Sequence, residues 1–261
     1  MNRKKILPTP PSNKQAMPDL PVTLSTHLDE LRKRIFPVIF SWFFFTAVSF
    51  YFAKNLIWIL KWPASGQIDT LAVFSPTAAI LAYIKIACAA GVACSLPIFL
   101  YEAWMFIAPA LDPRHAKNGL LFIVAGTLLF FSGAAFNFFL LIPASIRFLM
   151  SLGKGDLQFL ISLESYISFV LGLVLAGGLV FEMPVLAFIL AKFGILTAEK
   201  AMRGWRVAVI IILIAAAVLT PTPDVVNMLL MSLPMFVLYF ICVGVVAFVE
   251  NGKLKLRASL K

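Results

Sequence analysis

Apolar residues in this chain fall into long stretches that are separated by short polar segments. The stretches cover residues 36–53, 78–100, 119–143, 167–191, 207–219 and 225–249. A helix needs about 20 apolar residues to cross the hydrocarbon core of a bilayer. The pattern therefore predicts an all-α, polytopic membrane protein with six transmembrane helices. An even number of spans puts both ends of the chain on one side of the membrane.

The fifth stretch, residues 207–219, is the shortest, and we expect the fifth and sixth spans to form a short pair. A helix of this length extends only about 20 Å, against a hydrocarbon core of about 30 Å. Either the flanking Trp205 and Arg206 reach the interface from a short hairpin, or the bilayer is thinner there. A buried hairpin that does not cross the membrane would leave the topology unchanged.

Several helix starts are marked by a capping residue. Such residues precede the second, third, fifth and sixth spans, at Ser75-Pro76, Asp112-Pro113, Thr197 and Thr222-Pro223. The side-chain oxygen of a cap accepts a hydrogen bond from an unpaired backbone amide. Proline at the first helical position costs no hydrogen bond, because the backbone N–H at that position has no partner within the helix. Thr197 is expected to cap a short helix that runs from about Ala198 into the fifth span.

The two ends of the chain differ from its middle. Residues 1–23 are polar and rich in proline, which predicts a disordered tail without the apolar run of a cleaved signal peptide. We expect the membrane domain to cover residues 24–249 and a basic tail to cover residues 250–261.

Positive charge is distributed unevenly between the two sides. The chain has 22 Lys and Arg against 12 Asp and Glu, which gives a formal net charge of +10. Of the 22, 17 lie on the side of the termini and four on the opposite side, while Lys85 lies within the second span. Because cytoplasmic loops hold the positive charge, both termini are predicted to be cytoplasmic. This asymmetry explains the basic balance without nucleic acid.

Composition excludes several classes of protein. Hydrophobic residues make up 61% of the chain and charged residues 13%, which is unlike a water-soluble domain. The three cysteines lie inside apolar stretches without CxxC spacing, and there are only two histidines. No HExxH, GxSxG or phosphate-binding loop is present. We expect neither an enzyme nor a bound metal or cofactor.

Residues 24–35 predict an amphipathic helix at the membrane surface. An apolar stripe is formed by Leu24, Leu28, Leu31 and Ile35. Glu30 lies almost opposite and has two interpretations. It can pair with Arg34 one turn later, which stabilises a helix by about 0.2–0.5 kcal/mol. It can instead bind a cation at the interface, where the lower dielectric strengthens the attraction. The residue pattern alone favours the pair.

Two charged residues inside apolar stretches need a partner. Glu182 lies in the fourth stretch and is followed by Met183-Pro184, where the proline frees a backbone carbonyl one turn earlier. An ionised side chain at this depth costs at least about 2.5–3.5 kcal/mol. Glu182 is therefore either protonated and bonded to that carbonyl or part of a docking site. Lys85 either extends to the interface or pairs with Glu182.

Five sequence blocks, in order along the chain, resemble those of the TatC family, the receptor subunits of the twin-arginine protein translocase. The blocks are HLDELRKR at 27–34, FSPTAAILAYIK at 74–85, LPIFLYEAWMFIAPAL at 96–111, VFEMPV at 180–185 and LTPTPDVVN at 219–227. The resemblance implies a receptor in the bacterial inner membrane that binds twin-arginine signal peptides of folded precursors. It also implies export driven by the proton-motive force, with TatA and TatB as single-span partners in a multi-copy complex.

The resemblance assigns signal-peptide contacts at the cytoplasmic face. Glu30 matches the twin-arginine contact, and Arg32 matches a residue that positions the helix or meets lipid phosphate. An apolar wall beside them is implied for Phe106, Pro109 and Leu111. A carboxylate accepts both arms of a guanidinium, whereas lysine offers only a point charge, so Glu30 could distinguish arginine from lysine.

The resemblance also concerns a second acidic residue that contacts the signal peptide and the residues that dock the partner subunits. His115 stands where the family carries a second acidic residue, which leaves Glu102 as an alternative. The resemblance implies a polar site facing a partner at Glu182 and Pro184, and docking of TatA and TatB at Thr220 and Asp224. A secondary transporter with a midplane site at Glu182 and Lys85 is the alternative function.

Overall fold

The computed structural model describes residues 24–66, 71–110, 119–152, 160–220 and 225–258. Within these residues the chain is helical, apart from an isolated bridge between Ala72 and Ser162. The helices are α1 (Leu24–Tyr51), α2 (Ala53–Lys61), α3 (Pro76–Ile107), α4 (Gly119–Phe136), α5 (Ile142–Leu152), α6 (Leu163–Phe181), α7 (Met183–Lys192), α8 (Ala198–Arg203), α9 (Trp205–Leu219) and α10 (Val225–Ala258). The predicted all-α class is confirmed for this part of the chain, whereas the proposed tail at 1–23 lies outside it.

Five helical segments of the described chain are long and apolar enough to cross a membrane. They are Asp29–Tyr51, Pro76–Ile107, Gly119–Ser151, Leu163–Lys192 and Val225–Gly252. The remaining apolar helix, α9, has 15 residues and extends only about 22 Å. A multi-pass membrane protein with a short fifth apolar helix is therefore confirmed.

The prediction of a short sixth span is wrong. Helix α10 has 34 residues and continues to Ala258, past the end of the apolar stretch at residue 249. Pro234 lies inside the helix without ending it. The expected end at residue 249 was based on hydropathy. Lysine and leucine are good helix formers, so the helix continues beyond the apolar stretch.

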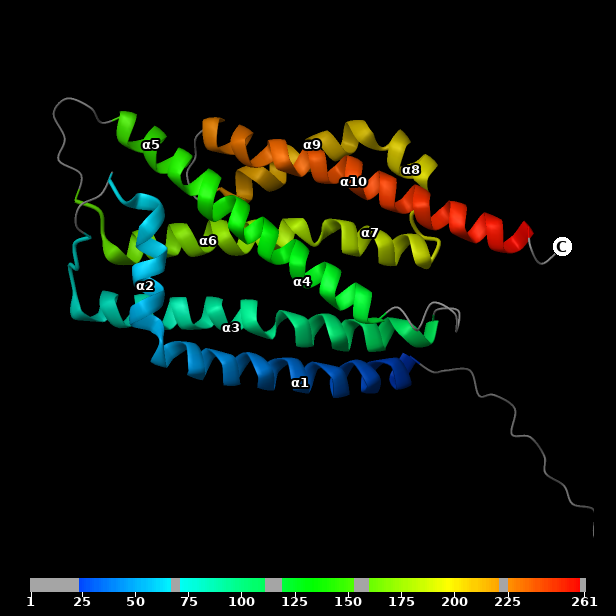
Figure 1. The fold of residues 1–261 in the computed structure, drawn as a ribbon, viewed down its shortest axis with the longest axis horizontal. Helices are drawn as coiled ribbons and strands as arrows, with labels where there is room; N and C mark the ends of the chain where they lie inside the picture. Colours follow the sequence, from blue (N-terminus) through cyan, green and yellow to red (C-terminus); the bar gives the residue numbers. More distant parts are fainter. Residues whose placement is uncertain (1–23, 67–70, 111–118, 153–159, 221–224, 259–261) are drawn as a thin grey trace, which may run out of the picture.

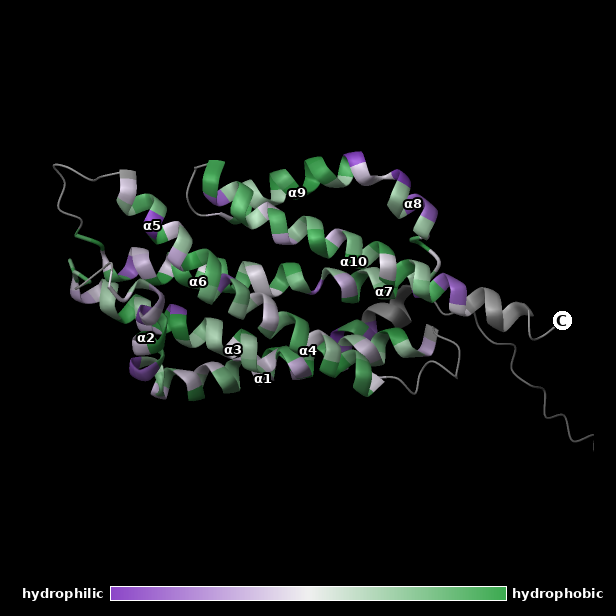
Figure 2. Ribbon diagram, turned by 45° about the horizontal axis from the view of Figure 1, so that its top comes forward, coloured by the Kyte–Doolittle hydropathy of each residue, from purple (hydrophilic) through white to green (hydrophobic). Residues whose placement is uncertain are grey.

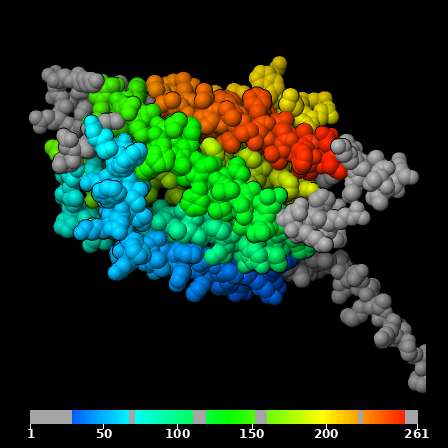
Figure 3. Space-filling view, viewed as in Figure 1, coloured from blue at the N-terminus to red at the C-terminus, as the bar shows by residue number. Residues whose placement is uncertain are grey.

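The long helices lie along one direction, and their ends gather at two poles (Figure 1). The start of α1 and the ends of α3, α7 and α10 lie at the same pole, on the right of the view, while α2 lies across the opposite pole. Figure 2 shows hydrophobic residues along the middle of the helices and hydrophilic ones in α8 and towards the end of α10. In Figure 3, α1, α3, α4 and α10 follow one another across one face.

Two of the predicted caps are present. Ser75 Oγ accepts a hydrogen bond from Ala78 N at 3.1 Å, with Pro76 at the first position of α3. Thr197 Oγ1 accepts one from Lys200 N at 3.3 Å, and α8 then ends at Gly204, before α9. The pairs at 112–113 and 222–223 lie outside the described residues.

Close contact between α4 and α6 depends on glycine. A Cβ atom on Gly133 would lie 2.4 Å from the carbonyl oxygen of Gly177, and one on Gly177 would lie 2.3 Å from Asn137 Nδ2. Asn137 is buried in a π-helical turn after α4 and donates to the carbonyl of Leu173. Glycine at the crossing allows this approach, since any side chain would meet backbone or a bonded amide.

Gly177→Ala should therefore lower the thermal stability of the detergent-solubilised protein. Overpacking of this kind costs about 1–3 kcal/mol. Gly172→Ala on the same helix is the matched control, because a Cβ there meets no heavy atom within 4 Å. Replacing glycine by alanine in an open helical position is neutral or stabilising by up to about 1 kcal/mol. Equal unfolding temperatures for the two variants would contradict the assigned contact.

Candidate functional site at the ends of α1 and α3

An arginine lies between two carboxylates where α1 begins and α3 ends. The Arg34 Nη2 and Nε atoms donate to Glu30 Oε1 at 2.9 and 3.2 Å, and Arg34 Nη1 donates to Glu102 Oε2 at 3.3 Å. The exposed fractions of the side chains are 22% for Arg34, 38% for Glu30 and 17% for Glu102. We call Glu30, Arg34 and Glu102 the acidic cluster. Its formal net charge, from two carboxylates and one guanidinium, is −1.

Helix packing creates the acidic cluster. Glu30 and Arg34 are one turn apart on α1, so their pair is intrahelical, as the sequence predicts. Glu102 comes from α3, which lies against α1. At the middle of this contact a Cβ on Gly91 would lie 2.2 Å from Thr46 Oγ1, so the two helices approach closely.

The second partner of Arg34 was missed in the sequence. Glu30 and Glu102 were each considered as separate contacts for an incoming arginine, but a guanidinium of the chain itself joins them. Glu102 is 68 residues from Arg34, and spacing along one helix carries no signal at that distance. Finding the contact from sequence would have required knowing that α1 pairs with α3, and in which register.

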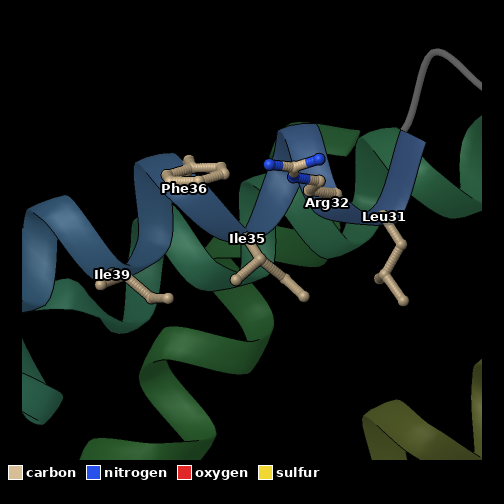
Figure 4. A pocket seen from close by; sticks show the side chains of 5 residues that line it. All are labelled: Leu31, Arg32, Ile35, Phe36 and Ile39. Carbon is tan, nitrogen blue, oxygen red and sulfur yellow. The ribbon is translucent and has the colours of Figure 1, made fainter. Parts of the chain in front are cut away.

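Arg32 is not part of the acidic cluster. Residues two positions apart on a helix do not face each other, so Arg32 lies on a different side of α1 from Glu30. It is exposed and lines a shallow groove of about 230 Å³. Figure 4 shows the other side chains that line this groove, Leu31, Ile35, Phe36 and Ile39. A cation among apolar side chains is compatible with contact with lipid phosphate, one of the two roles that the resemblance implies for Arg32, and both roles stay predictions.

The predicted apolar wall is only partly described. Phe106 lies one turn after Glu102 on α3, so the two share a side of the helix, and 36% of Phe106 is exposed. Pro109 is exposed in the 3-10 turn Ala108–Ala110 that follows α3. Leu111 and His115 lie outside the described residues. The structure therefore brings an aromatic ring, but not the complete wall, next to the acidic cluster.

Glu182 lies at the break between α6 and α7 and is 9% exposed. Pro184, which is also buried, occupies the start of α7. Neither carboxylate oxygen of Glu182 has a hydrogen-bond partner in the described structure, so the predicted bond to a freed carbonyl is not observed. A Cβ on Gly126 of α4 would lie 3.3 Å from Glu182 Oε2, which places the carboxylate against that helix.

Of the two alternatives left open for Lys85, pairing with Glu182 is not observed. Lys85 Nζ lies 2.9 Å from Glu164 Oε1 and 2.9 Å from Ser168 Oγ. Glu164 and Glu182 are separated along α6 by about 27 Å. Glu164, the second residue of α6, is the partner of Lys85, which lies in the third turn of α3. The common intramembrane site and the midplane transporter site at Lys85 and Glu182 are therefore not formed.

Thr220, predicted to dock a partner, ends α9. Its side chain is buried, and its hydroxyl donates to the carbonyl oxygen of Ala216 at 2.8 Å. Asp224 lies outside the described residues. No group of three or more His, Cys, Asp and Glu residues in the described chain could hold a metal ion.

These features define a multi-pass α-helical membrane protein with two carboxylates around one arginine at one pole of its helices. Residues 26–234 match the family model of the Sec-independent protein translocase protein TatC. The chain belongs to the TatC family, whose members take part in protein transport through the Tat translocase.

Known members of the family are similar over most of their length. TatC of Carboxydothermus hydrogenoformans is 34% identical over 234 residues, which cover 90% of this chain and 96% of that protein. TatC of Aquifex aeolicus is 35% identical over 224 residues, which cover 84% and 92%. A crystal structure of the twin-arginine translocase receptor TatC superposes with a TM-score of 0.76 at 34% identity, covering 86% of this chain and 99% of that one.

The Lys85–Glu164 ion pair can be measured by a double-mutant cycle with Lys85→Gln and Glu164→Gln. A half-exposed pair of this kind should give a coupling energy of about 0.2–1 kcal/mol in the free energy of unfolding. The matched cycle of Lys85→Gln with Glu182→Gln should give additive effects, because these side chains do not touch. Coupling confined to the second cycle would restore the pairing of Lys85 with Glu182.

Proposed function

We propose that this chain is the signal-peptide receptor of a twin-arginine translocase in the bacterial inner membrane. It binds the twin-arginine leader of folded precursors at its cytoplasmic face. Export across the membrane is driven by the proton-motive force. The observation that carries the proposal is the pair of carboxylates from α1 and α3 that both bond one guanidinium.

The chemistry of the acidic cluster supports binding of arginine. Glu30 and Glu102 already accept hydrogen bonds from a guanidinium of this chain, so their spacing suits that group. Both side chains are partly buried, which strengthens their attraction for a cation relative to open water. The net charge of −1 of the cluster attracts a positively charged leader.

Charge distribution supports the proposed orientation. The pole that holds the acidic cluster also holds the ends of α3, α7 and α10 (Figure 1). In the sequence, the polar segments that adjoin these helix ends are those counted with the termini, which together carry 17 of the 22 Lys and Arg. By the positive-inside rule, this pole and both termini face the cytoplasm, where a leader first meets the receptor.

We further propose that the Glu182–Pro184 break and the tip between α9 and α10 dock the single-span subunits TatA and TatB. A buried carboxylate without a hydrogen-bond partner is costly inside a membrane protein, and a polar group of a partner would offset that cost. The short α9 leaves exposed Ile210, Ile211 and Ile214 on one helix, which suits contact with another apolar helix. A multi-copy complex of this receptor with its partners is the assembly we expect.

Replacing a cluster carboxylate tests the receptor function. Glu30→Gln and Glu102→Gln should each weaken the binding of a fluorescent twin-arginine leader peptide to the purified chain in nanodiscs by about 10- to 100-fold, the cost of losing a hydrogen bond to a charged group. Export of a twin-arginine substrate in cells should fall in parallel. Glu199→Gln is the control, because that exposed carboxylate on α8 pairs only locally with Arg203. Unchanged peptide affinity in both cluster variants would reject the receptor site.

Glu182→Gln tests the docking proposal separately. The variant should reduce photo-crosslinking of TatA or TatB to the membrane-embedded chain while leaving leader binding intact, because Glu182 lies against Gly126 of α4 and takes no part in the ion pairs of the acidic cluster. Glu199→Gln again serves as the control. Wild-type crosslinking to both partners would show that Glu182 has a purely structural role.

A further inference from the structure

We propose that Arg34 is a built-in competitor of the signal peptide, which occupies the acidic cluster in the free receptor and sets the affinity that a leader must reach. The inference deepens the proposed receptor function and rests on it. Arg34 would then set the affinity of the site for every leader, although it belongs to the receptor and carries the same charged group as the ligand.

The geometry of Arg34 leaves room for a better ligand. Its Nη2 and Nε atoms converge on a single oxygen of Glu30, and the bond to Glu102 is 3.3 Å long. Strong charge-assisted bonds of this type are about 2.7–2.9 Å long, and the best pairs place two parallel N–H groups on the two oxygens of one carboxylate. Of the three bonds of Arg34, only the one from Nη2 to Glu30 Oε1, at 2.9 Å, is within this range, and no carboxylate accepts two parallel bonds on its two oxygens. Two incoming guanidinium groups, one for each carboxylate, can therefore form stronger bonds than Arg34 does.

In the free receptor, Arg34 reduces the repulsion between the two carboxylates. Without a cation, two partly buried carboxylates would face each other across the α1–α3 contact, and their repulsion would raise the free energy of the empty site. Arg34 lowers this cost. A leader with two arginines supplies two positive charges for two negative ones, after which the long Arg34 side chain, already 22% exposed, can turn towards headgroups and water.

Competition of this kind sets a threshold. A competitor at the same site lowers the apparent affinity of every ligand by a common factor, because only the unoccupied fraction binds. The ratio between a twin-arginine and a twin-lysine leader is then fixed by the carboxylates, which favour the guanidinium fork. Arg34 lowers both affinities. The lysine leader, which is the weaker ligand, then binds too weakly for export, while the arginine leader still binds.

A second role for Arg34 predicts the opposite sign. If Arg34 positions Glu30 and Glu102 for the leader, its removal disorders the carboxylates, and binding of every leader becomes weaker. The direction of the change in affinity therefore separates the two roles.

The test measures the binding of two fluorescent leader peptides, one with Arg-Arg and one with Lys-Lys, to the full chain in nanodiscs. Arg34→Gln should tighten both by about three- to tenfold, the size expected for one or two half-exposed ion pairs. Arg34→Lys should lie between wild type and Arg34→Gln, because lysine keeps the charge but loses the fork. In cells, Arg34→Gln should export a twin-lysine precursor that the wild type retains.

Lys33→Gln is the matched control. It removes one positive charge at the neighbouring position of α1, but Lys33 is exposed and shares no ion pair with the acidic cluster. Its affinities should stay near those of wild type, which separates loss of a competitor from a general change in charge. Equal tightening by Lys33→Gln would overturn the proposal.

The other outcomes are also decisive. Weaker binding of both leaders to Arg34→Gln, with an unfolding temperature like that of wild type, would overturn the competitor role in favour of positioning. If Arg34→Gln does not fold, Arg34→Lys carries the test, and affinities equal to or below wild type would overturn the proposal. A wild-type chain that binds neither leader would reject the receptor function itself, which is a different result from a change confined to Arg34.

Discussion

The cost of an unpaired charge in or near a bilayer is the constraint that organises this protein. Among the described charged residues at the helix contacts, Lys85 is bonded by Glu164, and Arg34 is shared by Glu30 and Glu102. The pairs Arg34–Glu102 and Lys85–Glu164 each join two helices, whereas Arg34–Glu30 lies within α1. The contact of α1 with α3 and that of α3 with α6 each include such a bond.

Small residues at the helix crossings allow the helices to approach each other closely. Gly91 allows α1 to approach α3, and Gly133 with Gly177 allows α4 to approach α6. In a bilayer the lipid tails are as apolar as the side chains, so close backbone approach and polar bonds stabilise helix contacts where hydrophobic burial cannot. The site at the ends of α1 and α3 thus depends on packing far from it, in the middle of the membrane.

Hydropathy and helix caps were sufficient to predict much of the fold. The all-α class, the short fifth helix and the caps at Ser75 and Thr197 follow from local sequence, and local sequence is what these features depend on. The length of α10 was misjudged because hydropathy reports where lipid ends, whereas the helix ends at Ala258. The partner of Lys85 stayed open for a different reason. Glu164 at the start of α6 was not considered from the sequence, and only the packing of α3 against α6 brings it to Lys85.

Glu182 departs from the rule that charge is paired. Its carboxylate is buried beside Gly126, and neither oxygen has a hydrogen-bond partner in the described structure. Simple helix packing could have avoided this cost, because glutamine or leucine would fill the same space. The residue lies where α6 breaks and Pro184 removes a backbone donor, so a bent backbone and an unsatisfied side chain occur together. A bond that forms only when another molecule is present would satisfy this carboxylate, and under the docking proposal a membrane-embedded partner helix supplies that bond.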